Sequence, residues 1–280
     1  MINNKFMFWC YDMDNFNNSF YFNYRISYNV KYYLFQNGVT NDQLPHTIIS
    51  KQGLIDHLLS QGVDDASVLV NSAINYAFDK KYFKYYSIEK DIHEYSDEWI
   101  TDFHSILKKL NLYGKFNELS ILNVGCNDAT QMEKLIGRTF KELYLVDIGI
   151  RSLQLAKKRF PDSKIIYTNA DDLNDIEDNS IDLYLSFRTY NSSLFNIEGS
   201  ILELNRVLSD NGAAIISIPN GYVDSDGNFS HGLKPHSEDY VDEVYPFEII
   251  GFILYYLSKH AFKNISILNS FYEIYIYTTR

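Results

Sequence analysis

The chain of 280 residues is poor in cysteine and in long apolar runs, and each shortage excludes a class of protein. Its two cysteines, Cys10 and Cys126, are too far apart in the sequence to make a disulfide framework, so a reducing, cytoplasmic location is expected. No apolar run is long enough to span a bilayer, and residues 1–5 lack the features of a signal peptide. We therefore expect neither a membrane association nor secretion.

Basic charge is also scarce, because the formal net charge is −11. Proteins that bind nucleic acids usually show a basic patch or stripe for the phosphates. The densest basic cluster, residues 157–159, lies on a predicted helix, and a solvated helix face explains it best. Nucleic acid is therefore not an expected partner. A hydrophobic content of 46% is enough for a substantial core.

The last two-thirds of the chain alternates short apolar runs with helical patterns. Such an alternation is typical of a parallel sheet covered by helices on both faces. The predicted strands are residues 120–124, 142–147, 164–167, 181–186 and 213–218. The predicted helices are residues 130–136, 152–160 and 197–208, the last expected to end at Asp210-Asn211-Gly212.

Two further strands, residues 262–268 and 272–278, are separated by only three residues, which requires an antiparallel hairpin. We therefore predict a three-layer α/β/α sandwich with a seven-stranded, mostly parallel sheet that ends in this hairpin. Residues 96–280 form this unit, beginning with an amphipathic helix at 96–110 that Ser96 can cap.

Residues 1–95 are predicted to form an N-terminal accessory region. Its expected strands are residues 6–9, 20–24 and 26–35, and its expected helices are residues 53–59 and 66–78. No catalytic motif stands in it. We expect this region to cover an active site, to form a subunit contact in a homo-oligomer, or to do both.

A nucleotide-type site is indicated by Gly125 and Asp147 together. Gly125 follows the first parallel strand, where a sharp turn lets a ligand approach the backbone and the N–H groups of the next helix. Asp147 ends the next strand about twenty residues later, where a carboxylate accepts hydrogen bonds from ribose hydroxyls. A lone glycine is a weak signal, but this order of glycine and acid is more specific.

Residues 96–280 resemble the class I methyltransferases that use S-adenosylmethionine. The resemblance rests on the loop 123–129, Asp147, the segments 169–173, 181–186 and 203–212, and the closing hairpin. It implies a Rossmann-like domain with S-adenosylmethionine as cofactor, and an insertion at 220–247 that serves as a lid or substrate wall. It also implies that the cofactor-binding residues are Asn123, Gly125, Cys126, Asn127, Asp147, Ile148, Asn169, Ala170, Asp171, Ser186 and Arg188.

The same resemblance assigns parts of the cofactor to these residues. Gly125 and its neighbours would contact the methionine part, Asp147 the ribose, and Asn169 the adenine amine, with Ala170 or Asp171 adding contacts there. Ser186, Phe187 and Arg188 would line the reactive end.

The chain departs from the family pattern at three positions of the loop. Asn123 stands where an acid is usual, and Asn127 and Ala129 stand where glycines are usual. Asparagine tolerates a left-handed backbone better than alanine does. A non-catalytic protein that keeps the fold and binds a protein partner therefore stays open as an alternative.

Methyl transfer requires an aligned acceptor, exclusion of water and sometimes removal of a proton. The polar segment 188–193 follows the fourth strand and either holds an acceptor or is an ordinary loop. Tyr190 in this segment and His231 and His236 in the insertion are the candidate catalytic residues, although an exposed loop explains either histidine as well. We predict no metal site, and we expect Cys126 to be packed rather than reactive.

The sequence thus predicts methyl transfer from S-adenosylmethionine to a small-molecule acceptor, with a protein acceptor as an alternative. A nicotinamide-dependent dehydrogenase fits poorly, because the second and third glycines are missing and the terminal hairpin is foreign to that fold. The Asn-Pro-Pro-Tyr motif that marks similar DNA amino-methylating enzymes is absent after the fourth strand.

Overall fold

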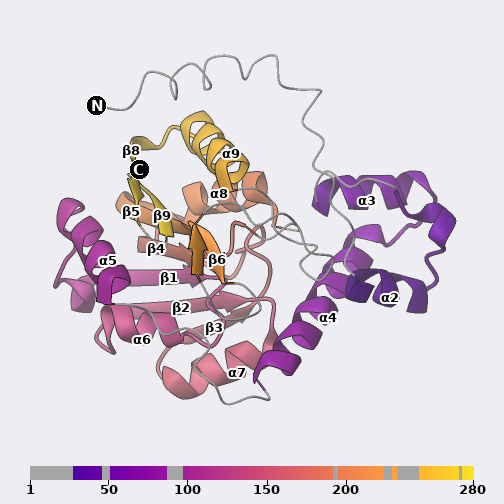
Figure 1. Ribbon diagram of the computed structural model, residues 1–280, viewed down its shortest axis with the longest axis horizontal. Coiled ribbons are helices and arrows are strands. Elements are labelled where there is room, and N and C mark those ends of the chain that lie inside the picture. The colour runs from indigo at the N-terminus through magenta and orange to yellow at the C-terminus, as the bar shows by residue number, and fades with distance from the viewer. Residues whose placement is uncertain are drawn as a thin grey trace.

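A seven-stranded sheet forms the centre of the protein (Figure 1). The computed structural model describes residues 28–45, 51–86, 97–191, 195–223, 229–231, 246–270 and 273–280. The strand order in the sheet is β3-β2-β1-β4-β5-β9-β8. The strands are β1 (Ser120–Val124), β2 (Glu142–Asp147), β3 (Lys164–Tyr167), β4 (Ile181–Phe187), β5 (Leu208–Pro219), β8 (Lys263–Asn269) and β9 (Glu273–Thr279).

The pairing of the strands confirms the predicted fold class. Strands β1 to β5 pair in parallel, β9 pairs antiparallel with β5, and β8 pairs antiparallel with β9. All five residues of β1 are buried, as expected for a strand covered on both faces. The strand order reverses between β1 and β4, and open α/β sheets bind their ligands at the carboxyl ends beside such a reversal.

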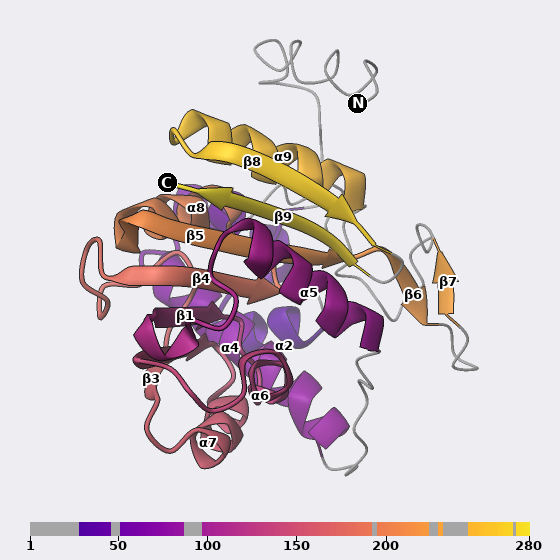
Figure 2. The same ribbon diagram turned by 90° about the vertical axis from the view of Figure 1, so that its left-hand side faces the viewer.

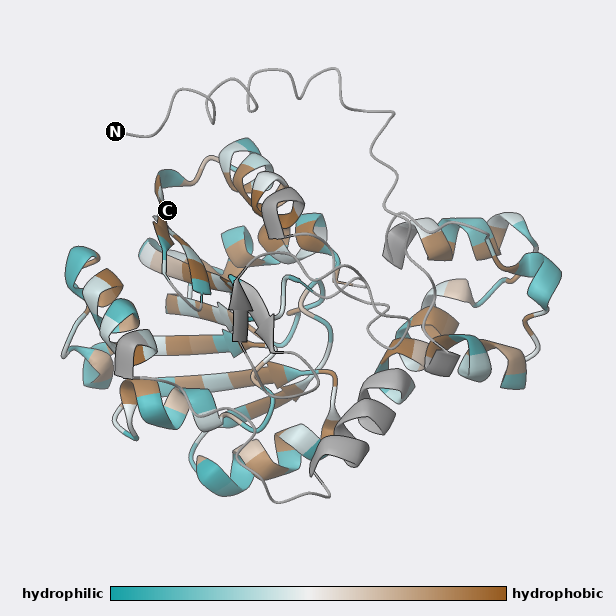
Figure 3. Cartoon of the chain, in the orientation of Figure 1, coloured by the Kyte–Doolittle hydropathy of each residue, from teal (hydrophilic) through white to brown (hydrophobic). Residues whose placement is uncertain are grey.

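Helices cover both faces of the sheet. The helices are α5 (Asp97–Lys109), α6 (Thr130–Ile136), α7 (Ile150–Arg159), α8 (Ile197–Val207) and α9 (Pro246–Lys259). Residues of α5, α6 and α7 share one buried cluster with one face of the sheet, and residues of α8 and α9 share another with the opposite face. Figure 2 shows α5 crossing one side of the sheet and α9 lying along β8 and β9. The apolar colouring of the strands in Figure 3 matches this arrangement.

The N-terminal region contains three helices that pack on one another. We call α2 (Tyr28–Gln36), α3 (Lys51–Ser60) and α4 (Ala66–Tyr86) the helical module. Short 3-10 turns also occur at η2 (Asn41–Gln43) and, before β1, at η3 (Phe116–Glu118). The module has its own apolar core, and α4 also contacts α7. Strands β1 and β2 point toward the module (Figure 1), so it stands beside their carboxyl ends.

The structure overturns the strand predicted at residues 26–35, because residues 28–36 form helix α2. Val30 and Leu34, four residues apart, are both fully buried in the core of the module. The neighbouring aromatic residues favoured a strand in isolation, but packing against α4 stabilises the helix. The strands expected at 6–9 and 20–24 lie outside the described residues, whereas the helices expected at 53–59 and 66–78 are confirmed within α3 and α4.

Gly212 does not end a helix as predicted. Helix α8 ends at Val207, and Gly212 lies inside β5. A Cβ atom on Gly212 would lie 2.7 Å from the Leu208 side chain and 2.9 Å from the carbonyl oxygen of Ile181. This glycine therefore permits a close approach between neighbouring strands.

The insertion predicted at 220–247 is described only in part. Its described residues include the antiparallel pair β6 (Gly221–Val223) and β7 (Phe229–His231), and residues 246–247 begin α9. Among the helices that the structure describes, none is both long and apolar enough to cross a membrane.

Candidate functional site

The loop after β1 keeps a regular alternation of left-handed residues. The backbone angle φ is +67° at Gly125, +53° at Asn127 and +58° at Ala129. The N–H groups of Gly125 and Cys126 both donate to the carbonyl oxygen of Val146, at 2.8 and 3.0 Å. The left-handed conformation costs a non-glycine residue about 1–2 kcal/mol. The loop therefore keeps its shape at Asn127 and Ala129 without glycine there.

Gly125 is required for space as well as for its backbone angle. A Cβ atom on this residue would overlap the side chain of Thr189, which follows β4. The Thr189 hydroxyl lies 3.1 Å from the carbonyl oxygen of Phe187 and donates to it. The segment after β4 thus packs directly against Gly125. The sequence alone does not indicate the contact of Thr189 with Gly125, because the two residues lie far apart along the chain.

Asp147 is buried at the end of β2 and anchors the backbone on both sides. Its Oδ2 accepts a hydrogen bond from the N–H of Asn127 at 2.8 Å, and its Oδ1 accepts one from the N–H of Gly149 at 2.8 Å. Asn127 belongs to the loop after β1, and Gly149 precedes helix α7. The carboxylate therefore holds the loop and the start of α7 in a fixed relation.

The buried polar groups below the loop include an unsatisfied amide. Both side-chain polar atoms of Asn123 are buried and find no hydrogen-bond partner in the described part of the chain. Ser186 is also buried, and its hydroxyl donates to the carbonyl oxygen of Val124 at 3.1 Å. An unpaired buried polar group costs about 1–3 kcal/mol, so Asn123 would gain from a polar ligand.

Cys126 is packed, as predicted. Its side chain is buried against the helices α5 and α6. Burial raises the pKa of the Cys126 thiol well above its ordinary value, and the nearby carboxylates of Asp147 and Asp128 raise it further. The thiol is therefore protonated and unsuited to nucleophilic chemistry.

Arg188 and Glu273 form an ion pair at the carboxyl edge of the sheet. Arg188 follows β4 with a left-handed backbone angle φ of +53°, and its Nε donates to Oε1 of Glu273 at the start of β9. The arginine side chain is 32% exposed, but that of Glu273 is only 1% exposed. Burial raises the pKa of Glu273, and the charge of Arg188 opposes the rise. The sequence offers one signal for Glu273: it is a single acidic residue at the start of an otherwise apolar predicted strand.

The residues predicted for the adenine side separate into two groups. Asn169 follows β3, and its Nδ2 donates to Oδ1 of Asn71 on helix α4 at 3.3 Å. Ile148 packs against the core of the helical module. By contrast, Oδ2 of Asp171 accepts from Asn196 at 2.9 Å, beside the start of α8. Ala170 is buried in the core under α8.

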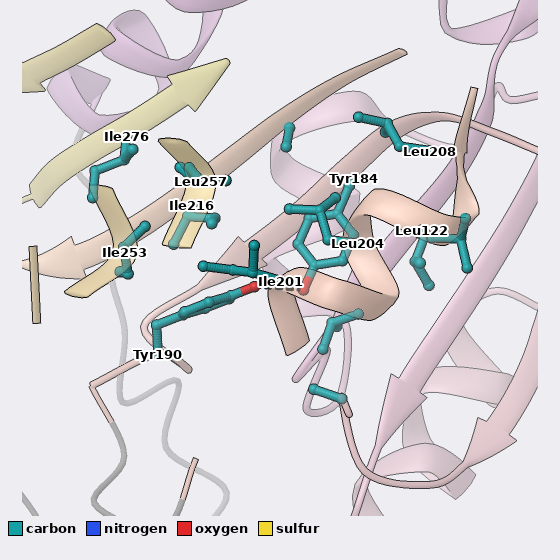
Figure 4. Packing of buried hydrophobic residues seen from close by; sticks show 14 of the residues in the cluster. Leu122, Tyr184, Tyr190, Ile201, Leu204, Leu208, Ile216, Ile253, Leu257 and Ile276 are labelled. Carbon is teal, nitrogen blue, oxygen red and sulfur yellow. Dashed lines mark hydrogen bonds between the residues drawn. The ribbon is translucent and has the colours of Figure 1, made fainter. Parts of the chain in front are cut away.

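Tyr190 lies in the apolar core rather than at an open surface (Figure 4). Its hydroxyl lies 3.1 Å from that of Tyr184, and burial raises the pKa of Tyr190 well above its usual value. This position argues against a role as proton acceptor, so catalysis by Tyr190 stays only a prediction. The side chain of His231 and the whole of His236 lie outside the described residues.

Comparison with known proteins gives a family match for the segment that carries this site. Residues 122–216 match the family model described as "Methyltransferase domain". No curated protein matches the sequence.

Solved structures of low sequence identity are similar to part of the chain. An S-adenosylmethionine-dependent methyltransferase from Mesorhizobium loti is 13% identical, with 66% of this chain and 98% of that chain covered and a TM-score of 0.49. A SAM-dependent methyltransferase from Aquifex aeolicus is 16% identical, with 64% of this chain and 89% of that chain covered and a TM-score of 0.47. A ribosomal protein L11 methylase from Lactobacillus delbrueckii subsp. bulgaricus is 14% identical, with 66% of this chain and 80% of that chain covered and a TM-score of 0.44.

The family match covers β1, the loop after it and the strands through β5, in the strand order already described. Residues 122–216 are therefore similar to the methyltransferase domain family, and this segment contains the loop after β1 and Asp147.

Proposed function

We propose that the protein transfers the methyl group of S-adenosylmethionine to a small-molecule acceptor. One observation carries this proposal: the loop after β1 and the carboxylate of Asp147 are bonded to each other at the strand-order reversal of the sheet. A glycine-containing turn after the first strand, next to a carboxylate at the end of the second strand, is an arrangement that binds an adenosine-containing cofactor.

Several groups of this site suit parts of that cofactor. Asp147 is held in place by two backbone N–H groups, so it presents a preorganised carboxylate to the ribose hydroxyls. Gly125 adopts the left-handed backbone that the turn beside this carboxylate requires. The unpaired amide of Asn123 can bond both to an amine and to a carboxylate, the two groups of the methionine part.

The chemistry needed from the protein is mainly alignment. S-adenosylmethionine supplies a methyl group activated by its positively charged sulfur, so the protein has to orient an acceptor and exclude water. Arg188, which follows β4 and is paired with Glu273, stands at the carboxyl edge of the sheet, where ligands of this fold class bind. Its left-handed backbone is a strained conformation of the kind found at functional sites.

Two features support a small acceptor. The net charge of −11 disfavours a polyanion such as nucleic acid. The helical module stands beside the carboxyl ends of β1 and β2 (Figure 1), which favours a small acceptor over a folded protein.

A methyl-transfer assay tests the acceptor class. The purified protein is incubated with S-adenosylmethionine carrying a labelled methyl group and, in parallel, with the small-molecule and the protein fractions of a cell extract. Label in the small-molecule products supports the proposal, with the Asp147→Ala variant as the inactive control. Label confined to proteins would contradict the small-molecule assignment but keep methyl transfer. A non-catalytic scaffold would transfer label to neither fraction.

A further inference from the structure

The helical module touches the methyltransferase domain at the side where a nucleoside would bind. Ile148 comes directly after Asp147 and packs against the core of the module. Asn169, at the end of the neighbouring strand β3, bonds to Asn71 of α4. The ends of β2 and β3 therefore both meet the module.

The direction of the bound nucleoside follows from the strand order. Asp147 at the end of β2 fixes the ribose, and the loop after β1 takes the opposite end of the cofactor. Strand β3 is the next strand outward from β2. A base attached to this ribose therefore extends toward β3 and α4, where Asn169 and Asn71 stand.

A second asparagine on α4 provides an unused acceptor at this place. Asn75 lies one helical turn after Asn71, so the two share a helix face. The Oδ1 atom of Asn75 is buried and has no hydrogen-bond partner among the residues that the structure describes. A buried acceptor without a donor costs free energy, and the amine of adenine is such a donor.

We propose that α4 forms one wall of the nucleoside pocket, with Asn71 positioning Asn169 and with Asn75 accepting a hydrogen bond from the adenine amine. This inference rests on the proposed function, because it assigns further residues to the same cofactor. It gives the helical module a direct part in cofactor binding, although no residue of the module lies in the matched methyltransferase segment.

Calorimetry on the full chain tests the assignment with three probes. S-adenosylhomocysteine is the demethylated cofactor, 5′-methylthioadenosine keeps the nucleoside but lacks the amino acid, and the S-inosyl analogue has a carbonyl oxygen in place of the adenine amine. Asn71→Ala and Asn75→Ala are each expected to weaken S-adenosylhomocysteine and 5′-methylthioadenosine by the same factor, about five- to tenfold. The wild type should bind S-adenosylhomocysteine more tightly than the S-inosyl analogue, and Asn75→Ala should reduce this ratio of affinities.

Asn205→Ala is a matched control, since it removes a half-buried asparagine near the end of α8 where the chain enters β5. Its affinity should equal that of the wild type. Circular dichroism checks that each variant is folded, and if Asn71→Ala unfolds, Asn75→Ala decides the question alone.

Wild-type affinity in both α4 variants, or an unchanged preference for adenine in Asn75→Ala, would overturn the inference while leaving the proposed function intact. Failure of the folded wild type to bind S-adenosylhomocysteine would remove both.

Discussion

The double role of Asp147 gives a prediction about replacing its carboxylate by an amide. Each of its two oxygens accepts a backbone N–H at 2.8 Å, one from Asn127 and one from Gly149. An amide has a single acceptor oxygen, so in Asp147→Asn one of the two N–H groups faces an NH₂ group in either orientation. The substitution is therefore not conservative at this site.

The magnitude follows from the two hydrogen bonds. Hydrogen bonds to charged groups contribute about 1.5–3 kcal/mol each, and a buried donor left unpaired costs about 1–3 kcal/mol. We expect Asp147→Ala to lower the free energy of unfolding by about 3–5 kcal/mol, and Asp147→Asn by about 2–3 kcal/mol. The matched control, Asp162→Asn, changes the same charge at an exposed position and should stay within about 0.5 kcal/mol of the wild type.

Urea unfolding followed by circular dichroism measures these differences. A ligand that binds the folded state raises stability in proportion to the logarithm of its concentration over Kd. Saturating S-adenosylhomocysteine should therefore stabilise the wild type and Asp162→Asn but not Asp147→Asn. A loss below about 0.5 kcal/mol in Asp147→Asn would refute the claim that its carboxylate holds the loop to α7.

Three further substitutions test other parts of the site. Gly125→Ala should destabilise the protein by about 3 kcal/mol, because the new Cβ atom overlaps Thr189 and the backbone is left-handed. In a Thr189→Gly background, which removes the overlapping side chain including its Cβ atom, the same substitution should cost only about 1–2 kcal/mol. Urea unfolding that gives the same cost in both backgrounds would contradict this. Burial raises the pKa of Glu273 in the folded protein, so its contribution to stability is present below the unfolded pKa of about 4.3 and is lost as pH rises through the folded pKa. Glu273→Gln still offers Arg188 an acceptor and should lose less stability than the wild type as pH rises above about 4.3. An equal loss of stability in urea titrations would count against the assignment. Tyr190→Phe should cost about 1 kcal/mol and leave the calorimetric affinity for S-adenosylhomocysteine unchanged, whereas a large loss of affinity would place Tyr190 in the site after all.

The sheet could be predicted from the sequence because its central strands are buried on both faces. Continuous apolar runs such as 120–124 mark these strands, and the short link between the last two strands requires a hairpin. The ends of β1 and β2 could be located for the same reason. In the structure, the loop that contains Gly125 contacts Asp147 and the residue before it, as the strand ends predict. The local sequence pattern therefore predicts the strands that position the site.

Contacts between distant segments could not be predicted from the sequence. Thr189 closes on Gly125, Glu273 pairs with Arg188, and Asn71 bonds to Asn169, each across a long stretch of chain. No local periodicity encodes such pairs, because they depend on how the elements pack. The same reason explains helix α2, whose aromatic residues favour a strand until packing against α4 is considered.

The loop 123–129 and Asp147 are expected to bind an adenosine-containing cofactor, and isothermal titration of the purified full chain with S-adenosylhomocysteine measures this binding. We predict saturable binding of one ligand per chain that Asp147→Ala weakens strongly. A folded protein that shows no heat of binding at millimolar ligand, and no thermal stabilisation by it, would contradict the claim.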